Sequence, residues 1–256
     1  MKDGKGSRNY SKTTLKVLFA FSGNQCAHPD CSEPIVASQT KYSDAKVIGH
    51  IAHIYAHSDG GPRSKPDLTE AERISPSNLL LLCPTHHGHV DGQHETYPAT
   101  LLLDWKAKHE RKYQNSLRVS ITDLGYAELE VAARALMASD SVEPDGNTHT
   151  LPPKQKIEKN NLGVGTESLL KMGAAKSEEV QATLQKSAQL DAGFPDRLRE
   201  GFVNRYNKLV SEGLKGDDLF LEMWTWAGGA GGDKIREAAG LCILTHLFII
   251  CDVFEK

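Results

Sequence analysis

The sequence lacks a hydrophobic run long enough to cross a membrane. Its longest apolar stretch, residues 238–250, is interrupted by Gly240, Thr245 and His246 and is shorter than the roughly 20 residues that a membrane helix needs. The first residues carry positive charges with no apolar run behind them, which is not the pattern of a secretory signal. We therefore expect a cytoplasmic protein with no membrane partner, in which residues 238–250 form a buried helix.

The sequence also lacks an excess of positive charge. Lysine and arginine together number 30 against 33 aspartates and glutamates, which gives a formal net charge of −3. This balance gives no overall signature of nucleic-acid binding, so any contact with DNA must come from local basic patches that the fold assembles. The candidates are residues 2–16 and 106–118, although each patch taken alone also fits a solvated helix face.

Cysteine is scarce, and its distribution argues against a disulfide framework. The chain has five cysteines, an odd number in a sequence without an export signal. Cys242 and Cys251 lie among apolar residues, where a free cysteine usually behaves as a small hydrophobic residue. The other three lie near histidines in the N-terminal part, which favours a metal site.

The organisation of the chain predicts an α+β fold followed by an all-α C-terminal part. A length of 256 residues fits one large domain or two modest ones. The segment 141–161 is rich in proline, glycine and polar residues and is the best candidate boundary. Residues 33–37 and 45–52 are typical of short strands, 57–76 of a loop, and Thr85 of the cap of a short helix ending near residue 92. Further helices are predicted at 11–22, from residue 98, and at 123–139, 176–190, 195–213, 216–228 and 233–254.

Two pairs of residues have the spacing of zinc ligands. Four residues arranged as Cys-x₄-Cys and, far along the chain, Cys-x₂-His suit a tetrahedral Zn²⁺ with a closed shell and no catalytic position. The predicted ligands of this structural zinc are Cys26, Cys31, Cys83 and His86. His28 lies inside the first pair and is an alternative ligand, although Pro29 beside it restricts the turn.

Three further residues follow these pairs in a recognisable order: His53 within Ala52-His53-Ile54, Asn78 within Ser77-Asn78-Leu79-Leu80, and His87 directly after His86. Together with the zinc pairs, they resemble the HNH, or ββα-metal, endonuclease family over about residues 20–112. The resemblance implies that His53 ends a strand and acts as a general base on water. It also implies that Asn78 fixes the backbone of the connecting loop and that His87, on a helix, binds a catalytic divalent metal, Mg²⁺ or Mn²⁺.

The chemistry of phosphodiester hydrolysis calls for these residue types. A neutral imidazole can activate water near pH 7, and a hard cation can act as a Lewis acid on the phosphate. His87 and Asp91 are four residues apart, so on a helix they share one face and can hold one ion together. His86 points about a quarter-turn away, which lets consecutive histidines serve two different metals.

One position departs from the family pattern. Members often carry an acidic residue or a histidine directly before the first motif histidine, and this chain has Ala52 there. His50 is the candidate replacement as a metal ligand. A regular strand would place His50 and His53 on opposite faces, so a bulge or a strand end is required. The remaining histidines nearby fit ordinary surface residues better; they are His57, His89 and His94.

The C-terminal apolar segment, residues 238–254, resembles the C-terminal helix of ABC-three-component accessory proteins, which act in systems that include Lamassu anti-phage defence. The resemblance implies that this part docks onto partner subunits, an SMC-like ATPase and a third accessory subunit, or onto a second copy of the chain in a homo-oligomer. We therefore divide the chain into a nuclease domain (1–118), a helix and linker (119–162) and a helical regulatory or oligomerisation domain (163–256).

The leading hypothesis is a metal-dependent HNH endonuclease that cuts double-stranded DNA as the effector of a multi-subunit defence complex. One alternative is a non-catalytic zinc module that binds DNA or protein after losing a metal ligand at Ala52. Another is a stand-alone restriction or homing nuclease, against which the acidic and apolar character of residues 212–256 argues. The feature that separates the first two is whether His50, His53, His87 and Asp91 converge on one point with an open side.

Overall fold

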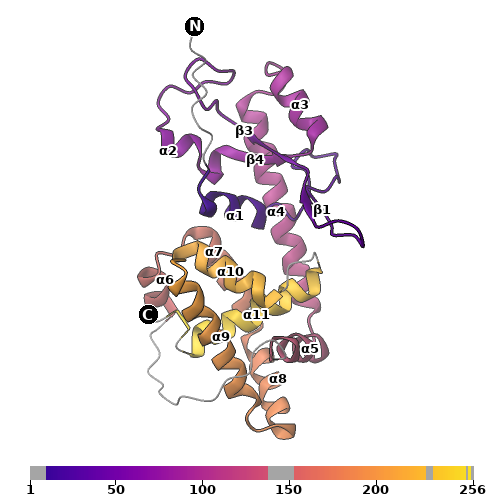
Figure 1. The fold of residues 1–256 in the computed structure, drawn as a ribbon, viewed down its shortest axis with the longest axis vertical. Coiled ribbons are helices and arrows are strands. Elements are labelled where there is room, and N and C mark those ends of the chain that lie inside the picture. Colours follow the sequence, from indigo (N-terminus) through magenta and orange to yellow (C-terminus); the bar gives the residue numbers. More distant parts are fainter. Residues whose placement is uncertain (1–9, 138–152, 229–232, 252, 255–256) are drawn as a thin grey trace. The chain divides into compact units, whose positions relative to one another are not determined.

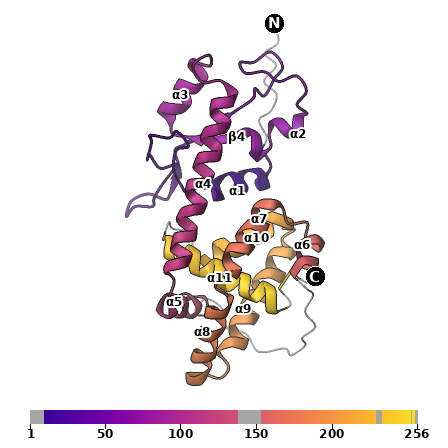
Figure 2. The same cartoon turned by 180° about the vertical axis from the view of Figure 1, so that it is seen from behind.

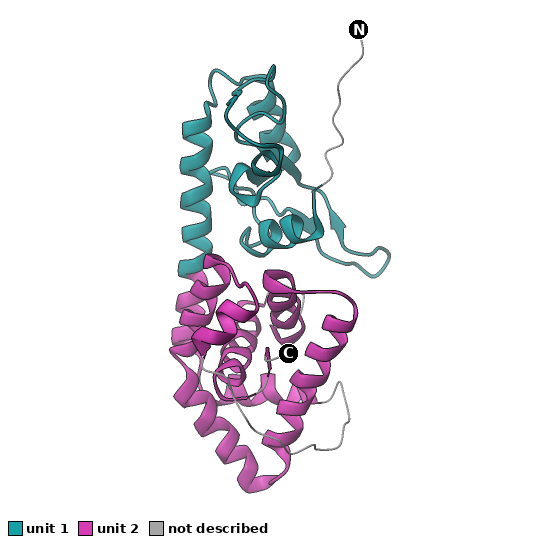
Figure 3. Cartoon of the chain, turned by 90° about the vertical axis from the view of Figure 1, so that its left-hand side faces the viewer, with its two compact units in different colours: residues 1–115 teal, residues 116–256 magenta. Residues whose placement is uncertain are grey.

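The structure is a computed structural model that describes residues 10–137, 153–228, 233–251 and 253–254. The chain forms two compact units, residues 1–115 and 116–256 (Figure 3). Helices make up most of the described chain, and two small antiparallel sheets complete an α+β mixture. No helix in these residues is long and apolar enough to cross a membrane. The basic residues 2–8 lie outside the described residues, and so does the part 141–152 of the predicted boundary 141–161.

All four strands of the described chain lie in unit 1, together with four helical elements and the first part of a fifth (Figure 1). In chain order they are α1 (Lys12–Ala20), β1 (Val36–Ala37), β2 (Lys46–Val47), β3 (His50–His53), α2 (Glu70–Arg73), η1 (Pro76–Asn78), β4 (Leu79–Leu82), α3 (Pro84–Gly92) and the first part of α4 (Ala99–Asp123). The side chain of Ser11 caps α1 by accepting a 2.9 Å hydrogen bond from the Thr14 N–H, as expected for an N-cap serine.

The strands β3 and β4 form the sheet that carries the candidate site. They pair antiparallel over four consecutive residues, from His50 opposite Leu82 to His53 opposite Leu79. All four residues of β4 are buried, and such a run does not show the alternation that marks a half-exposed strand. For this reason the sequence did not predict β4. The helix α3 follows β4 directly, whereas β3 and β4 are separated by residues 54–78, which contain α2 and η1.

The predicted strand 45–52 is divided into two strands that belong to different sheets. Its first part, β2, pairs with β1, and its second part, β3, pairs with β4. The division falls at Ile48 and Gly49, whose N–H groups both donate 2.9 Å hydrogen bonds to the Ile35 carbonyl. A methyl group on Gly49 would lie 2.7 Å from the Ile35 side chain, so this crossing requires glycine.

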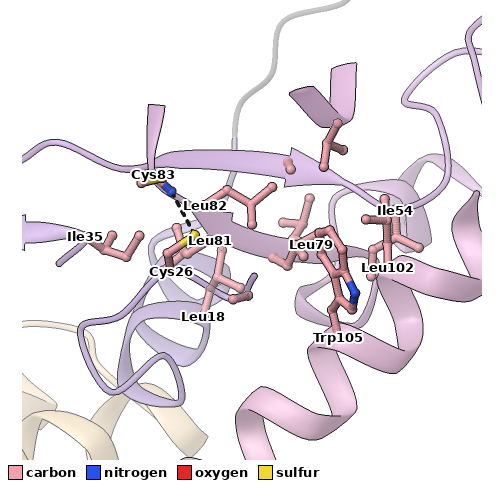
Figure 4. Close-up of a cluster of buried hydrophobic side chains, with 14 residues drawn as sticks. Leu18, Cys26, Ile35, Ile54, Leu79, Leu81, Leu82, Cys83, Leu102 and Trp105 are labelled. Atoms are coloured by element: carbon pink, nitrogen blue, oxygen red, sulfur yellow. Dashed lines mark hydrogen bonds between the residues drawn. The ribbon is translucent and has the colours of Figure 1, made fainter. Parts of the chain in front are cut away.

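The core of unit 1 lies around the β3–β4 sheet (Figure 4). Leu18 of α1, Ile54 beyond β3, and Leu102 and Trp105 of α4 are buried against the leucines of β4. Two of the predicted zinc ligands, Cys26 and Cys83, are buried in the same cluster. The predicted zinc ligands and the hydrophobic core are therefore continuous.

The segment 57–76 was predicted to be a loop throughout, and this prediction was wrong at its end. Residues Glu70–Arg73 form the one-turn helix α2, and Pro76–Asn78 form the 3₁₀ helix η1. A capping box starts α2: the Thr69 side chain accepts from the Glu72 N–H, and the Glu72 carboxylate accepts from the Thr69 N–H at 2.8 Å. The Thr-x-x-Glu pattern was visible in the sequence and would have identified the turn.

The described elements of unit 2 are helices only. Beyond the end of α4 they are α5 (Tyr126–Met137), α6 (Pro153–Lys159), α7 (Val164–Ala174), α8 (Ser177–Leu190), α9 (Phe194–Ser211), α10 (Gly216–Gly228) and α11 (Lys234–Ile250). The helices α8 to α11 lie within a few residues of their predicted bounds, whereas α6 and α7 were not predicted.

The apolar helix α11 lies at the centre of unit 2. Residues 238–248 are all buried, and α11 packs against α5, α7, α8 and α10 (Figures 1 and 2). The helices α11 and α10 pack so closely that a methyl group on Gly240 would lie 2.4 Å from the backbone nitrogen of Gly228. The helix that the sequence assigned to a bundle or an interface is thus enclosed within its own unit.

Candidate metal centre and active site

Three cysteines and one histidine of unit 1 form a cluster that could bind a metal ion such as zinc. The ligand atoms of Cys26, Cys31, Cys83 and His86 all lie within 4.8 Å of one another. His86 contributes Nδ1, which is 3.2 Å from the Cys83 sulfur and 3.7 Å from the Cys26 sulfur. Three soft sulfur ligands and one imidazole are a donor set that Zn²⁺ takes tetrahedrally, with no position left for a substrate.

The backbone shapes the first half of this cluster. Between α1 and β1, the chain turns so that the Cys26 N–H donates to the Glu33 carbonyl at 2.9 Å and the Cys31 N–H donates to the His28 carbonyl at 3.1 Å. The adjacent Ala27 N–H donates to Leu81 of β4 at 2.9 Å. This bond attaches the Cys26–Cys31 turn to the strand that directly precedes Cys83.

The second half of the cluster begins the helix α3. Cys83 is the N-cap residue and Pro84 occupies the first turn, a position where proline costs no hydrogen bond. The prediction that Thr85 caps this helix was therefore wrong, because the helix begins before it. The Cys83 N–H donates to the Cys26 sulfur at 3.3 Å (Figure 4), so the two halves of the cluster are also joined by a direct hydrogen bond.

The electrostatics of the cluster favour a bound cation. Burial raises the pKa of the Cys26 thiol to about 12, the hydrogen bonds from the Cys83 and His28 backbones oppose this, and the neighbouring sulfurs of Cys83 and Cys31 add to it. Burial also lowers the pKa of His86, helped by His28 and His89. His86 is thus neutral and able to act as a ligand at pH 7, whereas the Cys26 thiolate needs a positive charge beside it.

The alternative ligand His28 packs beside the cluster and is not one of its four members. Its ring stacks on that of His86 with centroids 3.9 Å apart and planes 12° apart, and its edge meets Trp105 at 4.6 Å. Its Nδ1 accepts a 3.3 Å hydrogen bond from the Asp30 N–H. His28 therefore fixes the orientation of the His86 ring from one side.

His87 points away from the cluster toward β3. Its ring centroid lies 5.0 Å from that of His50, and its Nε2 lies 3.7 Å from Asp91 Oδ2, one helical turn further along α3. The Asp91 side chain is 54% exposed and that of His87 is 22% exposed, while His50 is also exposed. These three residues share an open surface of unit 1.

His53 is the last residue of β3 and has other neighbours. Its Nε2 lies 3.4 Å from the Tyr10 hydroxyl, and its ring lies 5.4 Å from that of His57. The four residue pairs of the β3–β4 ladder are consecutive, so β3 contains no bulge and His50 and His53 occupy its two ends. The structure thus brings His50 to His87, and His53 to Tyr10 and His57.

The four candidate residues around the predicted catalytic metal do not gather into a second cluster. Within the described chain, the Cys26–His86 cluster is the group in which three or more histidine, cysteine or acidic side chains bring their ligand atoms together. His87 has Asp91 and His50 as separate close neighbours. Imidazole and carboxylate groups suit a divalent cation. These residues, however, come together only in pairs, His87 with Asp91 and His87 with His50.

Asn78 holds the chain just beyond β3. It is 5% exposed, and its Oδ1 accepts from the Tyr55 N–H at 2.8 Å. Its Nδ2 donates to the carbonyls of Tyr55 at 3.0 Å and Arg73 at 2.9 Å. The backbone of Asn78 adds a fourth link, since its carbonyl accepts from the Ile54 N–H at 2.9 Å. This one side chain therefore fixes both ends of the loop 54–78.

Two buried arginines in the same loop were missed in the sequence. Arg63 and Arg73 have side chains only 8% and 7% exposed. Arginine is almost always at the surface, and no local pattern marks a buried one, so only the fold reveals them. Tyr10 and His57 were also missed as neighbours of His53; His57 Nδ1 is buried with no hydrogen-bond partner.

The basic patch 106–118 is partly neutralised. Lys106 donates to the Leu79 carbonyl at 3.0 Å and lies 2.6 Å from Glu110, while Lys108 lies 2.7 Å from Asp104. Arg111 and Lys112 are exposed on the same stretch of α4. Two cations of unit 1 in this patch thus remain on the exposed surface for an anionic partner.

A comparison of the sequence with models of known protein families and with curated proteins finds no match. The function must therefore be inferred from the residues and their geometry.

Proposed function

We propose that the chain is a metal-dependent endonuclease of the HNH type that hydrolyses phosphodiester bonds in DNA. The single observation that carries the proposal is the division of labour between consecutive histidines on α3. His86 faces the Cys₃His cluster, while His87 faces His50 and Asp91 on an open surface. A zinc ion in the cluster would fix the start of α3 and, with it, the orientation of His87.

The proposed roles follow from position and chemistry. His53, half-buried at the end of β3, accepts the proton of the attacking water, with the Tyr10 hydroxyl beside its Nε2. His87 holds Mg²⁺ or Mn²⁺ with Asp91 or His50, and the cation supplies Lewis-acid stabilisation of the phosphate and the leaving oxygen. Asn78 keeps the loop beyond His53 in place through its bonds to Tyr55.

The test is a plasmid-nicking assay with Mg²⁺ or Mn²⁺, performed with the chain alone and with its co-purifying subunits. We expect His53→Ala and His87→Ala to abolish nicking while retaining zinc. His94→Ala is the matched control, because His94 is an exposed histidine beyond α3 and should nick normally. If the wild type never nicks under any of these conditions, and His53→Ala leaves phage protection in cells unchanged, the enzyme proposal is wrong.

We further propose that unit 2 assembles the nuclease with an SMC-like ATPase and a third accessory subunit in an anti-phage defence complex, and that the active form is a homo-oligomer. Because α11 is enclosed, docking would use the outer surfaces of unit 2, where Val164 and Leu190 are 85% and 79% exposed. Native mass spectrometry of the complex purified from its host tests this; a chain that purifies alone as a monomer would contradict it.

A second candidate function is a non-catalytic zinc module that binds DNA or protein. One specific observation favours it: His50, His53, His87 and Asp91 do not form a cluster of three or more ligands in the described chain. The position before His53 is filled by Ala52, which is 1% exposed and offers no ligand atom. This candidate predicts zinc retention and DNA or partner binding, with no binding of Mn²⁺ at His87 and no cleavage.

A further inference from the structure

Arg63 occupies an unusual backbone position in the loop between β3 and α2. It follows Gly60, Gly61 and Pro62 and has φ of +61°, a left-handed conformation that residues other than glycine rarely adopt. Its carbonyl accepts from the Ala56 N–H at 3.2 Å, which closes the turn. This conformation sends the long side chain back under the loop, where it is 8% exposed.

The guanidinium group of Arg63 joins the end of β3 to the last turn of α3. On the strand side, Nε donates to the Ile54 carbonyl at 3.0 Å and Nη2 donates to the His53 carbonyl at 3.2 Å. On the helix side, Nη1 donates to the Val90 carbonyl at 2.9 Å. One side chain thus spans the residue proposed as the base and the helix proposed to hold the metal.

The same guanidinium group also contacts the carboxylate of Asp91. Arg63 Nη2 lies 3.6 Å from Asp91 Oδ1, while the other oxygen, Oδ2, lies 3.7 Å from His87 Nε2. The carboxylate is therefore held between a cation and the histidine. A positive group is also favoured here because Val90 and Asp91 belong to the last turn of α3, where the helix carbonyls are negative.

Only arginine can make all of these contacts at once. Its planar fork offers five N–H donors in fixed directions, whereas lysine offers one nitrogen at the end of a flexible chain. Lysine at this position would keep the charge beside Asp91 and lose the simultaneous bonds to the strand and the helix. The geometry of the fork therefore matters here as well as the charge.

We propose that Arg63 is a positioning residue for the reaction: it holds the Asp91 carboxylate beside His87 and sets the separation between His53 and α3. The inference rests on the proposed nuclease function and adds a residue to it. Arg63 touches no reacting atom; it acts through Asp91, His87 and His53.

Arg73, the last residue of α2, provides a matched control within the same segment 54–78. It is equally buried and donates to the carbonyls of Ala56 at 2.8 Å, Leu68 at 3.1 Å and Lys65 at 3.2 Å, and it forms an ion pair with Asp59. All of these partners lie within residues 56–68. Arg73→Lys therefore disturbs the loop as Arg63→Lys does, without touching α3 or Asp91.

The experiment compares the wild type with Arg63→Lys, Arg63→Gly and Arg73→Lys. Zinc content and urea unfolding report the fold, Mn²⁺ binding measured by electron paramagnetic resonance reports the His87 site, and nicking gives kcat and KM. We expect Arg63→Lys to retain zinc and to lose about 10- to 100-fold in Mn²⁺ affinity or kcat, the range typical of residues that orient metal ligands. Arg73→Lys should keep a KM for DNA and a Mn²⁺ affinity near those of the wild type.

Arg63→Gly separates positioning from folding. Glycine adopts positive φ without strain, so the turn should persist while the side chain is lost. Added guanidinium ion at millimolar concentration should then restore part of the Mn²⁺ affinity and kcat of this variant, and should leave the wild type and Arg73→Lys unchanged.

The outcomes distinguish this inference from the function on which it rests. If Arg63→Lys behaves as the wild type does, or if both lysine variants lose Mn²⁺ affinity to the same extent, the positioning role is wrong and the nuclease proposal stands. Failure of guanidinium to restore Arg63→Gly also overturns it. If the wild type neither binds Mn²⁺ nor nicks DNA, both proposals fall together.

Discussion

Replacement of Asn78 should destabilise unit 1 by an amount that the structure lets us calculate. Asn78→Ala removes three hydrogen bonds, two to the backbone of Tyr55 and one to the carbonyl of Arg73. At a net value of about 1 kcal/mol for each bond, the loss is about 3 kcal/mol. With a urea slope of about 1.5 kcal/mol per M, the unfolding midpoint of unit 1 should fall by about 2 M.

Asn78→Asp sharpens the test because aspartate has nearly the same shape. The carboxylate keeps an acceptor for the Tyr55 N–H, but its second oxygen replaces the amide that donated to the Tyr55 and Arg73 carbonyls. Acceptor would then face acceptor in a buried site, which costs more than an absent bond. We expect Asn78→Asp to be at least as unstable as Asn78→Ala.

Hydrogen exchange followed by mass spectrometry is the suitable assay, since peptides from residues 116–256 serve as an internal reference for the unaffected unit. The amide of Tyr55, which Asn78 Oδ1 holds directly, should lose the most protection. If Asn78→Asp is as stable as the wild type, or if Asn78→Ala loses less than about 1 kcal/mol, the assigned hydrogen bonds do not hold the loop.

Three further perturbations have clear expected results. Cys26→Ser should abolish zinc retention and unfold unit 1, because structural zinc contributes roughly 10–16 kcal/mol in small domains; metal analysis and circular dichroism check this, and a folded, zinc-loaded variant would contradict it. Burial lowers the pKa of His109 from 6.5, so the unfolded state takes up its proton first as the pH falls. The stability of unit 1 should then be complete above pH 6.5 and decline below it, and His109→Gln should flatten that decline in urea titrations at several pH values. Gly240→Ala places a methyl group 2.4 Å from a backbone nitrogen of α10 and should destabilise unit 2 by about 1–3 kcal/mol or more, whereas Gly201→Ala, with no atom within 4 Å, should stabilise it by up to about 1 kcal/mol in thermal melts.

The features that the sequence predicted best are those with local causes. The helix 216–228 was predicted with its observed bounds, because hydrophobic periodicity and flanking glycines are local signals. The spacing of the cysteines and His86 likewise predicted four residues that the structure brings within 4.8 Å of one another. That a zinc ion binds there stays a prediction.

The features that the sequence did not predict depend on distant partners. Residues 164–174 were not among the predicted helices, yet α7 forms there. Gly173 is explained only by α11, since a methyl group on it would lie 2.3 Å from the Thr245 hydroxyl oxygen. In the same way, the neighbours of His50 and His53 follow from the pairing of β3 with β4, and no spacing rule assigns His50 to His87 and His53 to Tyr10.

The central position of α11 determines when each unit can fold during synthesis. Unit 1 has its core and its candidate metal ligands within residues 18–105, so it can fold while the rest of the chain is still being translated. Unit 2 lacks its central helix until residues 234–250 have been made, after all its other described helices. The helices α5, α7, α8 and α10 therefore leave the faces that pack against α11 exposed until α11 is made, and a chain truncated before residue 234 would consist of a folded unit 1 attached to an unfolded unit 2.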